Sequence, residues 1–327
     1  MSDRTDRRIE RVAVLGLGSI GLRHAGNARD QGRAVIGYDP SADACGCARD
    51  QGVEIATCAR DALATADAVV IASPSGRHLD DLEAAIAAQC PALVEKPIGH
   101  DPDRTAALLA RAEADGVPVG AAFNLRRRSV VEALHGTVVD RIGAPVWARF
   151  VSASWLPDWR PEQDYRTGYA SDPQSGGVVF DVIHELDLAV HMIGPAEVAA
   201  SVLRRSGRLE LPVEDGAEIV LRHANGCLSS LHLDFASPVR RRALEICGLH
   251  GSVEADLRSG ETVWRDAGGE RLETATVAID PDAEYRAVLA DFLDAIERGV
   301  APECDGAAGL AALHLAHRAR IDGEMPA

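Results

Sequence analysis

The chain contains one lysine, Lys96, among its 34 Lys and Arg residues, and it lies in the sequence Glu95-Lys96-Pro97. An arginine guanidinium is wide, planar and always protonated, whereas a lysine ammonium is a compact charge whose pKa shifts with its surroundings. A lysine kept in a chain that otherwise uses arginine favours a proton donor or a narrow cationic group at that position. The alternative is the chance survival of one surface lysine.

A second group of ionisable side chains lies in a segment that begins at Gly176-Gly177. Apolar residues from Val182 to Ile193 recur at helical spacing, which brings the polar side chains between them into a narrow arc of one helix. An imidazole beside a carboxylate is a suitable general base. The alternative is a polar stripe that faces water, with a capping aspartate at the first turn. The side chains in this arc are His184, Asp187 and His191, and Asp181 is adjacent to it.

We expect no metal site in this segment. His184-Glu185 begins like a metalloprotease motif, but Leu188 stands where the second histidine would be required.

A glycine-rich turn follows the first apolar run of the chain. Residues 11–15 predict a strand, and an Ala-rich helix follows Gly16-Leu-Gly18-Ser19-Ile20-Gly21. Glycines at these positions allow a tight turn, a close approach to a pyrophosphate, and close packing of helix on strand. The next apolar run, residues 34–38, ends at Asp39, where a carboxylate can accept the ribose hydroxyls of NAD. A turn or helix-capping role is the alternative for Asp39.

Strands and helices alternate through the first third of the chain. Further strands are expected over residues 67–72, 92–96 and 117–122, with helices over 77–89 and 102–115. This alternation predicts a doubly wound parallel sheet that binds ligands at the carboxyl ends of its strands, where Asp39, Ser73 and Lys96 all fall. We therefore predict an NAD(P)-binding Rossmann domain over residues 1–123.

Residues 124–327 are expected to form an α+β domain with a large, mostly antiparallel sheet open on one face. Successive strand-like runs carry this expectation, together with an Asn225-Gly226 hairpin turn. The C-terminal helices are candidates to pack back on the first domain. The strands are expected near residues 146–155, 217–224, 227–235, 242–248 and 252–256, and the helices near 129–140, 282–298 and 305–321.

Composition limits the class of partner. A net charge of −16 argues against nucleic acid and anionic membranes as partners. The seven cysteines are odd in number and form no Cys-x-x-Cys pair, which favours reduced thiols. The sequence has no signal-peptide pattern and no long apolar stretch, so we expect a cytoplasmic protein.

Three motifs in this order resemble the Gfo/Idh/MocA family (glucose–fructose oxidoreductase, inositol dehydrogenase and MocA-type proteins) over nearly the whole chain. They are the glycine turn continuing to His24, the Glu95-Lys96-Pro97 sequence, and Gly176-Gly177 leading to Asp181 and His184. The resemblance implies an NAD-dependent or NADP-dependent dehydrogenase or reductase that acts on a cyclic sugar, sugar derivative or inositol. It also implies a homodimer or homotetramer assembled through the open sheet.

The resemblance also implies roles for individual residues. Lys96 matches the catalytic lysine, His184 the general base and Asp181 its acidic partner. The spacing from Asp181 to His184 is shorter than is common in the family, so Asp187 is a second candidate for that partner. Lys96-Pro97 matches a bond often held cis. Cofactor contacts are expected from Gly16, Gly18, Ser19, Ile20, Gly21, Asp39, Ser73, Pro74, His78, Glu95 and Lys96, and substrate contacts from Asn124, Arg126 and Asp187.

The segment 155–166, called the aromatic loop below, resembles members associated with surface-polysaccharide or unusual-sugar biosynthesis. Its Trp159 and Tyr165 can stack on a sugar ring or base, and its Arg160 and Arg166 can bind a carboxylate or phosphate. We therefore expect a sugar-like substrate that carries negative charge. The alternative is that the aromatic side chains pack the loop and the arginines are solvated.

The chemistry expected is hydride transfer between a ring carbon and nicotinamide, with Lys96 and His184 converging on the reacting oxygen. Two other functions fit the same scaffold. One is an NAD-dependent glycosidase, which would accumulate no NADH. The other is a non-catalytic dinucleotide sensor, which has no use for acid–base groups.

Overall fold

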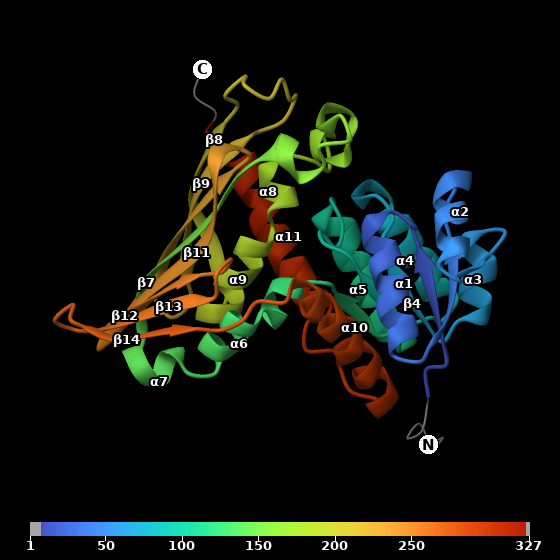
Figure 1. Cartoon of the computed structure of the whole chain (residues 1–327), viewed down its shortest axis with the longest axis horizontal. Helices are drawn as coiled ribbons and strands as arrows, with labels where there is room; N and C mark the ends of the chain where they lie inside the picture. Colours follow the sequence, from blue (N-terminus) through green and yellow to red (C-terminus); the bar gives the residue numbers. More distant parts are fainter. Residues whose placement is uncertain (1–7, 325–327) are drawn as a thin grey trace. The chain divides into compact units, whose positions relative to one another are not determined.

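The computed structural model of the chain describes residues 8–324, and these divide into two compact units (Figure 1). The first comprises the described residues through Asn124 together with Asp282–Ala311. The second comprises Leu125–Pro281 together with the described residues from Ala312 onward.

The first unit contains a six-stranded parallel sheet, as predicted. Parallel strands are buried on both faces, which agrees with the near-continuous apolar runs of the sequence. In spatial order the strands are β3 (Glu54–Ile55), β2 (Ala34–Tyr38), β1 (Arg11–Leu15), β4 (Ala68–Ile71), β5 (Ala92–Val94) and β6 (Val119–Ala121).

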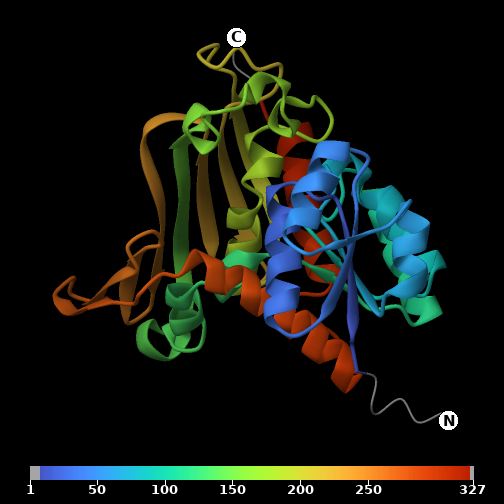
Figure 2. The same cartoon turned by 45° about the vertical axis from the view of Figure 1, so that its right-hand side comes forward.

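Helices cover both faces of this sheet (Figure 2). One core lies between the sheet, α1 (Ser19–Asp30), α2 (Ala42–Asp50) and α10 (Pro281–Arg298), and includes the fully buried Phe292. The opposite face carries α3 (Ala59–Thr65), α4 (His78–Ala87) and α5 (Pro102–Asp115). The first part of α11 (Gly306–Ile321) lies close to β6, because a Cβ built on Gly309 would be 2.9 Å from Ala121 Cβ.

The second unit is built on an eight-stranded, mostly antiparallel sheet. Its one parallel pair joins β7 and β10, and Asn225-Gly226 forms the predicted turn between β9 and β10. In spatial order the strands are β14 (Arg271–Thr276), β13 (Glu261–Asp266), β12 (Gly251–Asp256), β11 (Ala236–Gly248), β7 (Pro145–Trp155), β10 (Leu228–Asp234), β9 (Gly216–His223) and β8 (Ala196–Arg204).

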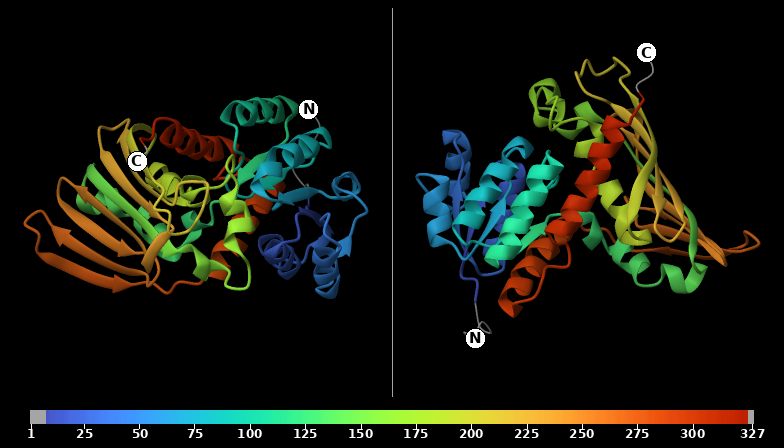
Figure 3. Two further views of the ribbon diagram at one scale, coloured as in Figure 1. Left: turned by 90° about the horizontal axis from the view of Figure 1, so that it is seen from above. Right: turned by 180° about the vertical axis from the view of Figure 1, so that it is seen from behind.

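One face of this sheet carries helices and the other carries none of the described helices, as Figure 3 shows. The inner residues of β9 and β10, such as Ile219 and Leu231, are fully buried, whereas Val220 and Leu228 on the alternate positions are exposed. This alternation confirms the expected open-faced sheet. The unit also contains 3-10 turns, of which η3 (Leu156–Trp159), η4 (Tyr165–Thr167) and η5 (Tyr169–Ser171) follow β7, and the helices α6 (Ser129–His135), α7 (Val138–Ile142), α8 (Val178–Asp181) and α9 (His184–Ile193).

Two expected helices differ from the structure. The helix predicted near 129–140 consists of α6 and α7, which Gly136 and Thr137 separate. The helix expected from Val182 to Ile193 is α9, which begins at His184, and a short break separates it from α8, which ends at Asp181. The β-branched residues Val182 and Ile183 stand at this break, where their restricted rotamers disfavour a regular helix.

None of the helices within residues 8–324 is both long enough and apolar enough to cross a membrane.

Candidate active site

The glycine turn after β1 has the shape that a pyrophosphate requires. Gly16 has φ +90, and a Cβ there would lie 2.4 Å from the Ser73 amide nitrogen. A Cβ at Gly21 would lie 1.8 Å from the Gly16 carbonyl oxygen, so α1 packs directly on the turn. Gly18, by contrast, has no atom within 4 Å of its Cβ position and gives α1 no side-chain cap. The open space and the uncapped N–H groups of α1 fit a dinucleotide phosphate.

Asp39 occupies the end of β2 and holds the adjoining turns. One of its oxygens accepts the Leu17 N–H and the other accepts the Ser41 N–H, both at 2.8 Å. Each carboxylate oxygen has a further lone pair, so the group can also accept ribose hydroxyls.

Lys96 follows β5 and is preceded by a buried, hydrogen-bonded carboxylate. Glu95 Oε1 lies 2.8 Å from His24 Nε2, and Glu95 Oε2 accepts the Lys96 N–H at 3.2 Å. His24 is fully buried on α1. Burial acts to raise the pKa of Glu95, but the hydrogen bond and charge of His24, together with Lys96, hold it below its ordinary value. The Lys96-Pro97 peptide bond is cis, as expected.

His78 joins the turn that follows β4 to the turn that follows β5. Its Nδ1 lies 2.7 Å from the Pro97 carbonyl oxygen and its Nε2 lies 2.8 Å from the Ser73 carbonyl oxygen. Burial lowers its pKa. The Ser73 hydroxyl in turn donates to Asp81 at 2.6 Å. His78 is therefore a residue that shapes these turns, and both of its ring nitrogens are already occupied.

The start of α10 supplies further polar groups to the same unit. The Asn124 amide donates to Glu284 at 2.9 Å, and both side chains are buried. Tyr285 lies edge-on to His24, with ring centroids 5.9 Å apart, and the Arg23 guanidinium lies 4.6 Å from the Tyr285 ring centroid. The His24–Glu95 pair is thus enclosed by an aromatic ring on one side.

In the second unit, Asp181 and His184 stand on either side of the α8–α9 break. Both are buried, and the Tyr169 hydroxyl donates to Asp181 at 3.2 Å. Gly177, with φ +90, leaves room for Glu214, whose carboxylate would lie 2.3 Å from a Cβ at that glycine. Glu214 accepts the Val179 N–H at the start of α8, and Arg320 pairs with it at 3.2 Å. The Gly176-Gly177 sequence therefore lets a carboxylate fix the start of the segment that carries Asp181.

The other ionisable residues of α9 have partners of their own. Arg126 donates in bidentate fashion to Asp187, with one contact at 2.9 Å. Burial raises the pKa of Asp187, and Arg126 opposes that shift. His191 stacks on His135 with ring centroids 4.0 Å apart, and burial, aided by Arg126, lowers its pKa to about 3. Asp187 and His191 thus both have contact partners within the second unit.

The aromatic loop is held by its own contacts. Trp159 donates to Ser154 at 2.9 Å and meets Phe235 edge-on. The Tyr165 hydroxyl donates to the Leu209 carbonyl at 3.3 Å. Arg166 forms ion pairs with Asp164 and Glu210, both at 2.9 Å. The Arg160 guanidinium lies 5.7 Å from the Tyr169 ring centroid.

Two family models match this chain. Residues 10–123 match the oxidoreductase family with an NAD-binding Rossmann fold, and residues 139–254 match the GFO/IDH/MocA C-terminal domain.

The chain belongs to the Gfo/Idh/MocA oxidoreductase family.

Members of known activity are similar to this Gfo/Idh/MocA protein over most of its length. The inositol 2-dehydrogenase of Rhizobium meliloti is 29% identical, over 94% of this chain and 95% of that protein. The 1,5-anhydro-D-fructose reductase of Ensifer adhaerens is 28% identical, over 75% and 73% respectively. An oxidoreductase from Agrobacterium radiobacter, solved with NAD+, L-tartaric acid and magnesium, has the same fold, with a TM-score of 0.87, 20% identity, and coverage of 97% and 96%.

This Gfo/Idh/MocA chain is therefore an NAD(P)-binding oxidoreductase, and the relatives named above act on a sugar derivative or on inositol. Its glycine turn, Asp39 and the uncapped start of α1 are the residues that would hold the dinucleotide.

Several polar contacts in this Gfo/Idh/MocA protein could not be predicted from its sequence. The sequence places His24 in the glycine motif but does not predict its pairing with Glu95, which lies 71 residues away. The ion pair between Glu185 and Arg242 likewise joins α9 to β11. The sequence signal for this ion pair was the run Arg240-Arg241-Arg242. Side chains alternate along a strand, so Arg240 and Arg242 lie on one face and Arg241 lies on the other.

Proposed function

We propose that this enzyme transfers a hydride between nicotinamide and a secondary alcohol or ketone on the ring of a sugar, sugar nucleotide or inositol. The observation that carries the proposal is the placement of the only lysine: Lys96 stands at the carboxyl end of β5, directly after a buried carboxylate that His24 holds. Parallel sheets of this kind bind dinucleotides at that edge.

In the oxidative direction, Lys96 donates a hydrogen bond to the reacting oxygen and stabilises the negative charge that develops there. His184 accepts the hydroxyl proton as the C–O bond becomes a carbonyl. A dinucleotide held at the glycine turn and Asp39 would supply the hydride acceptor for this oxidation. In the reductive direction His184 returns the proton. Asp181, which accepts a hydrogen bond from Tyr169, is proposed to orient His184.

The test is turnover of two variants. Lys96→Met and His184→Ala should lower turnover by roughly 10²- to 10⁴-fold while the Kd for NAD stays close to that of the parent. His314→Ala, which changes an exposed histidine on α11, is the matched control and should keep parental turnover. Parental turnover in both Lys96→Met and His184→Ala would exclude these roles.

We also propose a homo-oligomer that forms through the open face of the eight-stranded sheet. Exposed apolar side chains gather on that face, and Leu228 pairs in register with Trp147 on the neighbouring strand. The others are Val202 and Val220. A cytoplasmic location is proposed from the seven cysteines, all of which are free thiols.

A further inference from the structure

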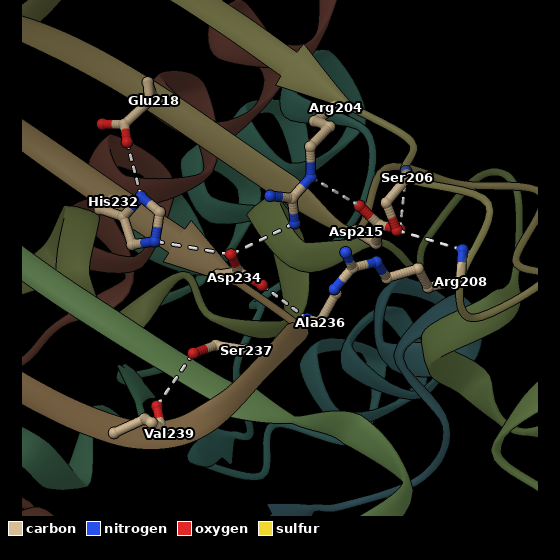
Figure 4. Close-up of polar contacts among 10 residues, drawn as sticks. All are labelled: Arg204, Ser206, Arg208, Asp215, Glu218, His232, Asp234, Ala236, Ser237 and Val239. Carbon is tan, nitrogen blue, oxygen red and sulfur yellow. Dashed lines mark hydrogen bonds and ion pairs between the residues drawn. The ribbon is translucent and has the colours of Figure 1, made fainter.

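Strand β11 bulges beside the aromatic loop. Ala236 pairs with Trp155 and Arg241 pairs with Ala153, so residues 237–240 stand opposite Ser154 alone. Figure 4 shows how this bulge begins: Asp234 accepts the Ala236 N–H at 2.6 Å, Arg204 contacts Asp234, and the Ser237 hydroxyl donates to the Val239 carbonyl. Bulges of this kind redirect side chains and are common next to active sites.

Four arginines, here called the basic cluster, converge after the bulge on the helix-bearing side of the sheet. Arg242 pairs with Glu185, the residue after His184, at 2.7 Å. The other contacts that assemble the cluster run through the backbone. Arg258 donates to the Arg240 carbonyl at 2.9 Å, Arg128 donates to the Leu257 carbonyl at 2.8 Å, and the Leu257 N–H donates to the Arg242 carbonyl at 2.8 Å.

At the exposed end of the basic cluster, Asp256 accepts the Arg258 backbone N–H and interacts electrostatically with the Arg258 side chain, whereas in the described part of the chain Arg240 has only the charges of arginines around it. Within residues 8–324, the Arg240 guanidinium makes no ion pair or hydrogen bond, and both Arg240 and Arg258 are exposed. Burial lowers the pKa of Arg240, and the charges of Arg258, Arg242 and Arg128 lower it further. Since guanidinium groups stay protonated at neutral pH, these charges repel one another, and a bound anion would relieve that repulsion.

A partly exposed aromatic side chain lies next to the bulge. Trp159 donates to Ser154, the residue opposite the bulge, and leans edge-on against Phe235, which precedes it. The Trp159 side chain is 40% exposed, so part of its indole is available to a ligand. Aromatic faces of this kind stack on sugar rings and bases.

We propose that Arg240 and Arg258 bind the phosphate or carboxylate of an anionic sugar substrate whose ring or base lies on Trp159. The proposal rests on the proposed oxidoreductase function and specifies its substrate class. The proposal places the anion contact at Arg240 and Arg258 and not at Arg166, because the Arg166 guanidinium forms ion pairs with Asp164 and Glu210.

The kinetic test compares neutral and anionic forms of the same sugar: a free hexose, its phosphate, its uronic acid and its uridine diphosphate conjugate. For the anionic substrates that the parent turns over, Arg240→Ala and Arg258→Ala should raise KM roughly 10- to 100-fold and change kcat little. A rise in KM for the phosphate and nucleotide forms alone identifies a phosphate site. A rise in KM for the uronic acid alone identifies a carboxylate site. Arg241→Ala is the matched control, because Arg241 is exposed, adjacent and on the opposite side of the strand.

A binding test keeps this proposal separate from the proposed function. With NAD present to fill the dinucleotide site, inorganic pyrophosphate should raise the unfolding midpoint of the parent and of Arg241→Ala. It should leave the midpoint of an Arg240→Ala/Arg258→Ala double variant unchanged. If the parent oxidises no sugar, the proposed function fails while the pyrophosphate result still decides the anion site. If the double variant behaves like Arg241→Ala with pyrophosphate, and its KM values match too, the anion site is refuted.

Discussion

The carboxylate of Glu95 is buried and yet held in its charged form beside Lys96. Desolvation alone would favour the protonated acid, and the contact with His24 reverses that preference. The ammonium of Lys96 therefore has a fixed negative neighbour. His24 is a positioning residue in this account, because it reaches Lys96 only through Glu95.

Replacing His24 should change how stability depends on pH. In the parent, the lowered pKa of Glu95 stabilises the fold above the pKa of the unfolded chain, and this contribution is lost as the pH falls through the folded pKa. In His24→Ala, burial should raise the pKa of Glu95 above its unfolded value, so the carboxylate becomes destabilising near neutral pH. We expect His24→Ala to cost about 1–3 kcal/mol more at about pH 7 than at about pH 4, measured by urea unfolding.

Two controls separate this effect from a simple packing loss. His24→Gln keeps an N–H donor and should restore much of the parental pH dependence. In a Glu95→Gln background, His24→Ala should cost the same free energy of unfolding at both pH values. A pH-independent loss in His24→Ala itself would show that His24 only fills space.

At the scale of elements, two glycines of the turn have different roles: Gly21 is required for folding and Gly18 for cofactor binding. Gly21→Ala should lower the unfolding midpoint strongly, because its Cβ would collide with the Gly16 carbonyl at 1.8 Å. Gly18→Ala should leave the midpoint of the free protein nearly unchanged, since its Cβ position is open, and yet weaken NAD binding at least 10-fold by filling the pyrophosphate space.

Thermal unfolding without cofactor and titration with NAD would measure the two effects. If Gly18→Ala binds NAD like the parent, the phosphate lies elsewhere.

The elements that the sequence predicted well are those with a continuous apolar run or a clear alternation of apolar and polar residues. Buried runs such as residues 11–15 form the parallel sheet, and alternation along residues 217–224 and 227–235 marks β9 and β10. Strand β14 is largely exposed and has no apolar side to reveal it. The break between α8 and α9 was also missed, because apolar residues at helical spacing continue across it.

The partners of charged side chains could not be predicted from spacing. Arg126 and Asp187 both look available for substrate in the sequence, but they lie 61 residues apart and bind each other in the fold. The same holds for Arg166 with Glu210. Residues expected to contact substrate are thus paired with each other or with neighbours in the second unit, and the exposed arginines after the β11 bulge were not singled out.

At the scale of the molecule, the open sheet face predicts self-association. Val220→Glu with Leu228→Glu would place two charges among the exposed apolar side chains of that face and should lower the mass measured by light scattering. Val300→Glu, at an exposed apolar position outside the sheet, should keep the parental mass. A parent that is monomeric at micromolar concentration would contradict this assembly.

We expect the chain to oxidise or reduce its substrate with net consumption of the dinucleotide. The direct measurement follows the absorbance of reduced nicotinamide with inositols, neutral sugars, acidic sugars and sugar nucleotides, while the ketone or alcohol product is quantified in the same sample. We predict that at least one substrate gives one reduced nicotinamide per ketone formed, or the reverse, and that Lys96→Met abolishes most of this signal. Substrate conversion without net change in the dinucleotide would contradict the account and favour a glycosidase.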